Sequence, residues 1–311
     1  MNSQLTITTG ASSNHFLPLQ SLLWTIAKFE PAARVIAYDL GLTADEHAYL
    51  EHTPPFFLKQ FELRTFDFEK YPPHFSIAVE AGRMAFRPTI LAAIAKELSL
   101  VGRASPRAAA NSPPSAEFPS ASQLETPNPK PETILLWLDS GCQLREPLHE
   151  LRACIARVGV YSPCAPGTIE ATLHPAARAP LNVTEDLLTL PIRDAGICGF
   201  DLSDSVAAVS DRRTNLPPNR RTKILTLLDR WSEVALDKNS TAPEGSTRRT
   251  HRQDAVFAVI LNQAAKANHW TLEPKRLRGL AIKQDSLTLA ETKFRTDLGA
   301  PASRRRVPVS P

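Results

Sequence analysis

Cysteine is scarce in this sequence. The 311 residues include four cysteines, and none of them stands in a Cys-x-x-Cys pair. Zinc sites and disulfide scaffolds built on cysteine show recognisable spacings, so this sequence predicts neither. A chain of this length buries a large core without cross-links. We expect the cysteines to be buried free thiols, at Cys142, Cys154, Cys164 and Cys198.

Long apolar runs are also missing. No stretch of about 18 apolar residues is present, as a membrane-spanning helix would need. The N-terminus lacks the basic-then-apolar pattern of a secretory signal. As written, the chain is expected to be soluble and uncleaved, with no membrane segment.

The sequence also lacks a strong net charge of either sign. The net charge is +4, and Arg304, Arg305 and Arg306 supply three of those charges from a tail rich in proline and serine. The rest of the chain is close to neutral. Binding to a nucleic-acid backbone needs clustered Lys and Arg on the folded domain, so we expect no nucleic-acid partner.

Residues 101–131 contain seven prolines and almost no large apolar side chains. Such a segment cannot bury enough surface to order itself, which predicts a disordered insertion. A domain boundary is the rival interpretation, but the first hundred residues make a poor closed unit. We therefore expect one domain formed by residues 1–100 and 132–298, and a disordered basic tail at 299–311.

The remaining sequence alternates between two hydrophobic periodicities. Strands are expected at residues 5–9, 34–38, 61–68, 134–138 and 195–200. Helices are expected at residues 16–29, 43–50, 83–98, 148–158, 221–236 and 253–266. Thr43 and Glu46 have the spacing of a capping box. This order predicts an α/β domain with a mainly parallel central sheet flanked by helices, whose ligands bind at the carboxyl ends of strands.

The opening stretch LTITTGASSNHFLPL contains TGASS, a fragment also found where short-chain dehydrogenases begin. A dinucleotide-binding turn needs several glycines near the pyrophosphate, but the next glycine after Gly10 is Gly41. Phe16 would block the approach of the ligand. None of the tyrosines has a lysine four residues further on, as the dehydrogenase reaction requires. A dehydrogenase is therefore not expected.

Asp139 ends ILLWLD, the most apolar strand of the sequence. A carboxylate at the end of a central strand lies where it can bind Mg²⁺ or Mn²⁺. Such an ion would neutralise the diphosphate that departs when a nucleotide sugar is cleaved. The alternative is that Asp139 merely caps the turn formed with Ser140 and Gly141.

Two other stretches carry candidate ligand-binding residues. Arg83 and Arg87 begin the helix that precedes this strand, where guanidinium groups and a helix N-terminus favour phosphate; a solvated surface role is the alternative. Asp39 ends the second strand beside Gly41, where an acidic residue commonly meets the ribose or base of a nucleotide. A turn-forming role explains Asp39 almost equally well.

The segment RTHRQDAVFAVIL begins a later helix. Thr250 and Gln253 have capping-box spacing, which would place His251, Arg252 and Asp254 in the first turn. Asp254 would orient a sugar or acceptor hydroxyl, and His251 would complete a metal site. The alternative is ordinary helix-start chemistry, with Asp254 stabilised by the helix dipole.

Six stretches together resemble glycosyltransferases of the GT-A fold, the nucleotide-diphospho-sugar transferase group. They also resemble, more narrowly, a glycosyltransferase-like family described only as a domain of unknown function. The matching stretches are ITTGASSNHFLPLQSLL, RVIAYDLGL, FDFEKYPPHF, RMAFRP, LLWLDSG and RWSEVALDKNSTAPEGSTRRTHRQDAVFAVIL, within residues 4–265. The resemblance implies a GT-A-like single domain that transfers a sugar from a nucleotide-diphosphate donor to a glycan or protein acceptor, assisted by Mn²⁺ or Mg²⁺.

Site residues follow from the same resemblance. Ser12, Asn14 and Asp39 would line the nucleotide, Asp139 would hold the metal and diphosphate, and His251 with Asp254 would act at the sugar.

The sequence departs from the GT-A pattern at the metal. An Asp-x-Asp motif is usual in that group, whereas Asp139 is followed by Ser140 and Gly141. Phe86 and Arg87 stand where an aromatic residue followed by lysine is frequent. These departures leave open a catalytically inactive GT-A-like protein that binds a glycan or a partner. An interaction scaffold acting through the insertion and the tail is a third, less supported interpretation.

Overall fold

The computed structural model describes residues 4–54, 57–79, 84–101, 133–203 and 219–282. Arg83 and the predicted tail at 299–311 lie outside these ranges. The predicted insertion at 101–131 also lies outside them, apart from Val101, which ends a helix.

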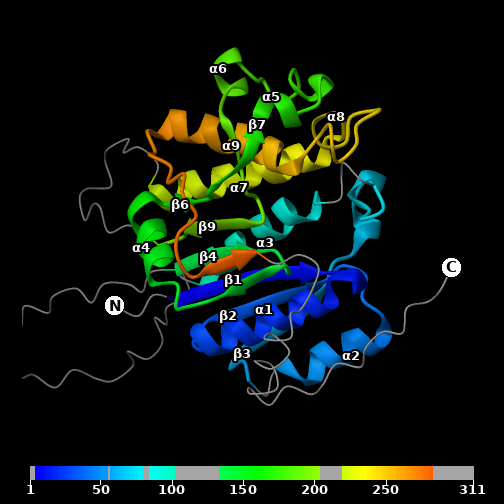
Figure 1. Ribbon diagram of the computed structural model, residues 1–311, viewed down its shortest axis with the longest axis vertical. Helices are drawn as coiled ribbons and strands as arrows, with labels where there is room; N and C mark the ends of the chain where they lie inside the picture. The colour runs from blue at the N-terminus through cyan, green and yellow to red at the C-terminus, as the bar shows by residue number, and fades with distance from the viewer. Residues whose placement is uncertain (1–3, 55–56, 80–83, 102–132, 204–218, 283–311) are drawn as a thin grey trace, which may run out of the picture.

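A six-stranded sheet runs through the centre of the described chain, in the order β3-β2-β1-β4-β9-β6 (Figure 1). Its first four strands are parallel to one another, whereas β9 is antiparallel to both of its neighbours. The strands are β1 (Gln4–Ala11), β2 (Arg34–Asp39), β3 (Gln60–Thr65), β4 (Thr133–Leu138), β9 (Ile197–Asp201) and β6 (Val160–Tyr161). The prediction of an α/β fold with a mainly parallel sheet is confirmed.

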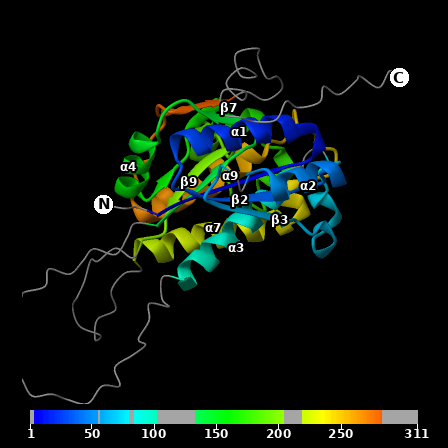
Figure 2. The ribbon, with the colours of Figure 1, turned by 90° about the horizontal axis from the view of Figure 1, so that it is seen from below.

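Helices cover both faces of this sheet (Figure 2). One face carries α1 (Phe16–Phe29) and α4 (His149–Val158); the other carries α3 (Phe86–Val101) and α7 (Arg220–Leu236), with α9 (Gln253–Asn268) packed on α7. Successive side chains of a strand point to opposite faces. Leu135 accordingly packs in the core on the α3 side and Leu136 in the core on the α1 side. Burial on both faces explains why β4 is apolar throughout.

Local sequence signals set several helix ends. The hydroxyl of Thr43 accepts the N–H of Glu46 while the Glu46 carboxylate accepts the N–H of Thr43, so α2 (Ala44–His52) begins with the predicted capping box. Gly159 ends α4 in the left-handed conformation that glycine adopts without a steric penalty.

Short elements complete the described structure and were not predicted, because they span too few residues to show a periodicity. Two small sheets pair β5 (Cys142–Leu144) with β10 (Leu280–Ile282), and β7 (Cys164–Thr168) with β8 (Pro191–Arg193). The short helices are α5 (Ile169–Thr172), α6 (Glu185–Leu188) and α8 (Lys238–Thr241).

The cysteines are free, and Cys142, Cys154 and Cys198 are buried, as expected, while Cys164 is partly exposed. Within the described ranges, the helices are all too short or too polar to cross a bilayer.

Candidate functional site

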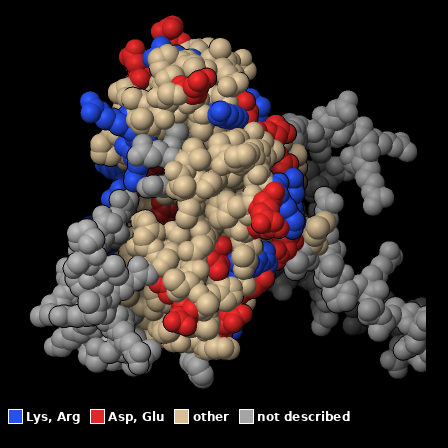
Figure 3. Space-filling model, turned by 90° about the vertical axis from the view of Figure 1, so that its right-hand side faces the viewer, with Lys and Arg blue, Asp and Glu red and all other residues tan. Residues whose placement is uncertain are grey.

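The sheet has a switch point between β1 and β4. The chain adds β2 and β3 on one side of β1, and then returns to place β4 on the other side. Ligands of such sheets bind beyond the carboxyl ends of the strands at the switch point. Asp139 directly follows β4 there, next to the end of β1 at Ala11. Figure 3 looks onto this edge, where acidic side chains are set back in a hollow beside basic ones.

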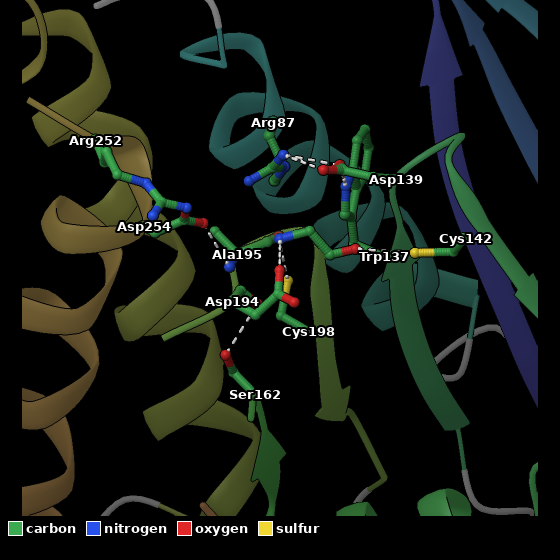
Figure 4. A network of polar contacts seen from close by, with 11 residues as sticks. Arg87, Trp137, Asp139, Cys142, Ser162, Asp194, Ala195, Cys198, Arg252 and Asp254 are labelled. Carbon is green, nitrogen blue, oxygen red and sulfur yellow. Dashed lines mark hydrogen bonds and ion pairs between the residues drawn. The ribbon is translucent and has the colours of Figure 1, made fainter. Parts of the chain in front are cut away.

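Asp139 forms an ion pair with Arg87 at the start of α3 (Figure 4). The Arg87 guanidinium donates to both carboxylate oxygens, at 2.7 Å and 2.9 Å, and the indole N–H of Trp137 donates to Asp139 Oδ1 at 2.7 Å. The Arg87 side chain is 3% exposed and that of Asp139 is 32% exposed. Burial opposes the charge of Arg87, but the charges of Asp139 and Asp254 outweigh it and raise the Arg87 pKa. Arg87 is therefore a fixed, buried cation beneath Asp139.

The turn 194–196 lies beside this pair. The Asp139 N–H donates to the carbonyl of Gly196 at 2.8 Å, and Asp194 Oδ1 accepts the N–H of Gly196 at 3.0 Å. Because β9 is antiparallel to β4, the turn that enters β9 lies at the carboxyl end of β4. A parallel β9 would place the same turn at the opposite edge of the sheet. The direction of β9 thus builds this part of the site.

Asp194 is a largely buried carboxylate, with its side chain 14% exposed, that the sequence-based prediction missed. Burial, followed by the charges of Asp254 and Asp139, raises the Asp194 pKa to about 6. Its Oδ2 lies 3.4 Å from the guanidinium of Arg276, in the segment before β10. Arg-Asp-Ala-Gly before an apolar strand is a turn signal that would have drawn attention to Asp194, whereas nothing in the local sequence marks Arg276.

Asp254 reaches the turn from the first turn of α9. Its Oδ1 accepts the N–H of Ala195 at 3.0 Å, and its Oδ2 lies 2.5 Å from the guanidinium of Arg252. Figure 4 shows Asp139 and Asp254 on either side of Ala195. Three carboxylates and three guanidinium groups therefore meet at this edge. We call them the Asp–Arg cluster: Asp139 with Arg87, Asp194 with Arg276, and Asp254 with Arg252.

The residues predicted to line the nucleotide lie at the ends of β1 and β2, at the same edge of the sheet. The Ser12 hydroxyl donates to Asn14 Oδ1 at 2.6 Å. Asp39 accepts the N–H groups of Gly41 and Leu42 at 2.8 Å each, and its second oxygen lies 2.7 Å from His47 Nδ1. Asp39 therefore does form the turn that the sequence suggested as an alternative. Its register partner is Ala11, which keeps it beside the end of β1.

His251 is buried, with 1% of its surface exposed, and it contacts His174 rather than the Arg87 and Trp137 side chains that surround Asp139. Its Nδ1 accepts the N–H of His174 at 3.3 Å, and backbone groups of Ser240 and Thr241 lie close to the ring. Burial and the neighbouring His174 lower the His251 pKa to about 4, so the ring is neutral at physiological pH. A neutral ring that accepts at Nδ1 carries its hydrogen on Nε2, which leaves no free lone pair for a metal.

The capping box predicted at Thr250 and Gln253 is wrong. Thr250 bonds to Thr247, and the Gln253 amide donates to the carbonyl of Thr241 at 2.8 Å. Arg252 is the N-cap residue and is extended, so α9 begins at Gln253. Asp254 lies in the first turn as predicted, but His251 and Arg252 precede the helix.

A divalent cation does not fit the residues present. Within the described ranges, no group of three or more His, Cys, Asp and Glu side chains is placed to hold a metal ion. Asp139 Oδ1 already accepts two N–H groups and Oδ2 accepts one, and a buried guanidinium stands where a cation would balance the carboxylate. The structure gives no support to the metal site expected at Asp139 and His251.

Residues 1–92 match the family described as "Protein of unknown function (DUF1647)". None of the curated proteins matches the chain.

Several similar solved structures are of glycosyltransferases. The bifunctional glycosyltransferase WbbM is 11% identical with a TM-score of 0.43, over 84% of this chain and 38% of WbbM. The galactosyltransferase LgtC, with donor and acceptor sugar analogues, is 10% identical with a TM-score of 0.43, over 97% of this chain and 98% of LgtC. Core-mannan synthase A from Aspergillus fumigatus, in an Mn/GDP form, is 10% identical with a TM-score of 0.42, over 84% of this chain and 70% of the synthase. This chain thus spans well under half of the length of WbbM.

Proposed function

We propose that this chain is a glycosyltransferase-like protein that binds a nucleotide-diphosphate sugar at the switch-point edge and transfers the sugar to a glycan or protein acceptor. One observation carries the proposal. The Asp–Arg cluster brings together side chains from α3, the end of β4, the turn 194–196, the start of α9 and the segment before β10, at the edge that also holds Ser12, Asn14 and Asp39. Packing of the hydrophobic core does not require so many partly exposed charged side chains at the ends of the strands. Their concentration at this edge is therefore better explained by a binding site.

The two parts of the edge suit the two parts of such a donor. Small polar side chains and the backbone at the ends of β1 and β2 suit the nucleoside. Guanidinium groups suit the diphosphate, whose negative charge grows as the sugar leaves. The Asp254 carboxylate is 20% exposed and retains lone pairs that would accept a sugar or acceptor hydroxyl.

Isothermal titration calorimetry with UDP-sugars and GDP-sugars tests this proposal. We expect binding by the wild type and weaker binding by Asp139→Ala and Asp254→Ala. Asp186→Ala is a matched control, because Asp186 is an exposed aspartate paired with Lys266 on the surface. Absence of binding by the wild type to every donor, or equal binding by all four proteins, would refute the proposal.

A catalytically inactive binding protein is the second candidate. The engagement of both Asp139 oxygens by Arg87 favours it, since that carboxylate has little capacity left for chemistry. Release of nucleoside diphosphate from a bound donor distinguishes the two. Release that Asp254→Ala abolishes supports a transferase, and donor binding without release supports the inactive protein.

A further inference from the structure

Each carboxylate of the Asp–Arg cluster has its own guanidinium. The nitrogen-to-oxygen distances are 2.7 Å for Arg87 and Asp139, 2.5 Å for Arg252 and Asp254, and 3.4 Å for Arg276 and Asp194. Three negative charges are therefore balanced within the chain when all three aspartates are ionised. A divalent cation requires excess negative charge from its ligands, and the three paired aspartates of the cluster offer none.

Arg87 is the least replaceable of the three cations. It is 3% exposed, contacts both oxygens of Asp139 and lies over the Trp137 ring, with its guanidinium carbon 5.7 Å from the ring centroid. A metal ion that claimed Asp139 would strip Arg87 of its counter-ion inside the protein. Breaking a buried ion pair in this way is strongly unfavourable, because the remaining charge stays out of water.

Arg252 and Arg276 differ from Arg87 in exposure. Their side chains are 38% and 41% exposed, against 20% and 14% for their partners Asp254 and Asp194. Each arginine therefore lies on the solvent side of its carboxylate, at the rim of the cluster. Flexible, exposed guanidinium groups bind phosphate oxygens in a bidentate manner.

We propose that this edge binds the diphosphate of its nucleotide ligand without a divalent cation, through Arg252 and Arg276, while the buried Arg87 holds Asp139 in a neutral ion pair. The inference rests on the proposed function and deepens it. Arg87 is a positioning residue that takes the place of the metal ion beneath Asp139. Arg252 and Arg276 turn from their aspartates to the phosphate oxygens when the ligand arrives.

Calorimetric titration of the full chain with UDP and with GDP tests the inference, once in excess EDTA and once with added Mn²⁺. We expect one of the nucleotides to bind with the same affinity in both buffers. Binding that requires Mn²⁺ overturns the inference and leaves the proposed function standing. No binding in either buffer overturns both.

Charge-removing variants test the role of the rim. Arg252→Gln and Arg276→Gln should each weaken nucleotide binding about tenfold, the loss expected for a charge-assisted hydrogen bond. Arg230→Gln is the control, because Arg230 is similarly exposed and pairs with Glu233 on α7, away from the cluster. Equal affinity in Arg252→Gln, Arg276→Gln and the control overturns the inference.

The Arg87→Gln variant gives a direct readout of metal binding. Removing the guanidinium frees Asp139, so Mn²⁺ affinity measured by electron paramagnetic resonance should rise at least about tenfold over that of the wild type. Circular dichroism checks that the variant folds. If it does not fold, the wild-type titrations in EDTA and in Mn²⁺ still test the inference, because they do not use the variant. Equal Mn²⁺ binding by wild type and a folded variant contradicts the inference.

Discussion

The Asp139 carboxylate balances the positive charge of the buried Arg87 guanidinium. In Asp139→Asn, Arg87 keeps one acceptor oxygen but loses its counter-ion, while its side chain is 3% exposed. We expect the free energy of unfolding, measured in urea, to fall by about 3 kcal/mol. Asp186→Asn removes an aspartate that is 60% exposed and should change it by less than about 0.5 kcal/mol. Losses of similar size in the two variants would show that Arg87 is not buried as described.

Asp194 should make stability depend on pH in a direction opposite to that of an ordinary ion-paired aspartate. Burial raises its pKa from 3.8 to about 6, so the folded state binds this proton more tightly than the unfolded chain. The contribution of Asp194 to the unfolding free energy is therefore complete below about pH 4 and is lost as the pH rises to about 6, by about 3 kcal/mol at most.

Asp194→Asn removes this titration. Urea unfolding at several pH values should show that the wild type loses stability relative to Asp194→Asn between about pH 4 and about pH 6. Titrating groups that do not interact with Asp194 cancel in that difference. A constant difference across the range, or one that moves in favour of the wild type, would contradict the raised pKa.

The turn 194–196 is hydrogen-bonded to the end of β4 on one side and to the start of α9 on the other. Gly196 is its most tightly packed residue. A Cβ at Gly196 would lie 2.5 Å from Asp139 Oδ2 and 3.1 Å from Asp194 Oδ1. Gly196→Ala should therefore displace both carboxylates and weaken nucleotide binding about tenfold or more, while circular dichroism remains that of the wild type. In Gly245→Ala the added Cβ meets nothing within 4 Å, but the positive φ of 75° strains the alanine, so this variant controls for backbone strain outside the turn. Unchanged binding in Gly196→Ala would show that the turn does not position the site.

Long elements with a regular hydrophobic pattern were predictable from the sequence, as were helix ends set by neighbouring residues. Helix α1 begins and ends at the predicted residues, and the Thr43 capping box is present, because its partners are three residues apart in sequence. The start of α9 was not predictable, since distant contacts determine it. The Arg252 N–H donates to the carbonyl of Thr172, and Gln253 donates to Thr241. Those contacts override the local preference for a capping box at Thr250.

The candidate site depends on contacts between distant parts of the chain, whereas the individual helices and strands depend mainly on local sequence. Sequence reasoning identified Arg87, Asp139 and Asp254 singly, but their partners lie far along the chain: Asp139 is 52 residues from Arg87, and Asp254 is 59 residues from Ala195. The antiparallel direction of β9 brings the turn 194–196 to this edge, and the β9 sequence does not encode a direction. Asp194 and Arg276 escaped prediction for that reason.

Hydrogen exchange with and without the nucleotide that binds, UDP or GDP, directly locates the nucleotide-binding surface. We expect slower exchange at the segments of the switch-point edge, residues 11–16, 39–42, 139–142 and 194–197. Binding that protects other segments and leaves these unchanged would contradict this expectation.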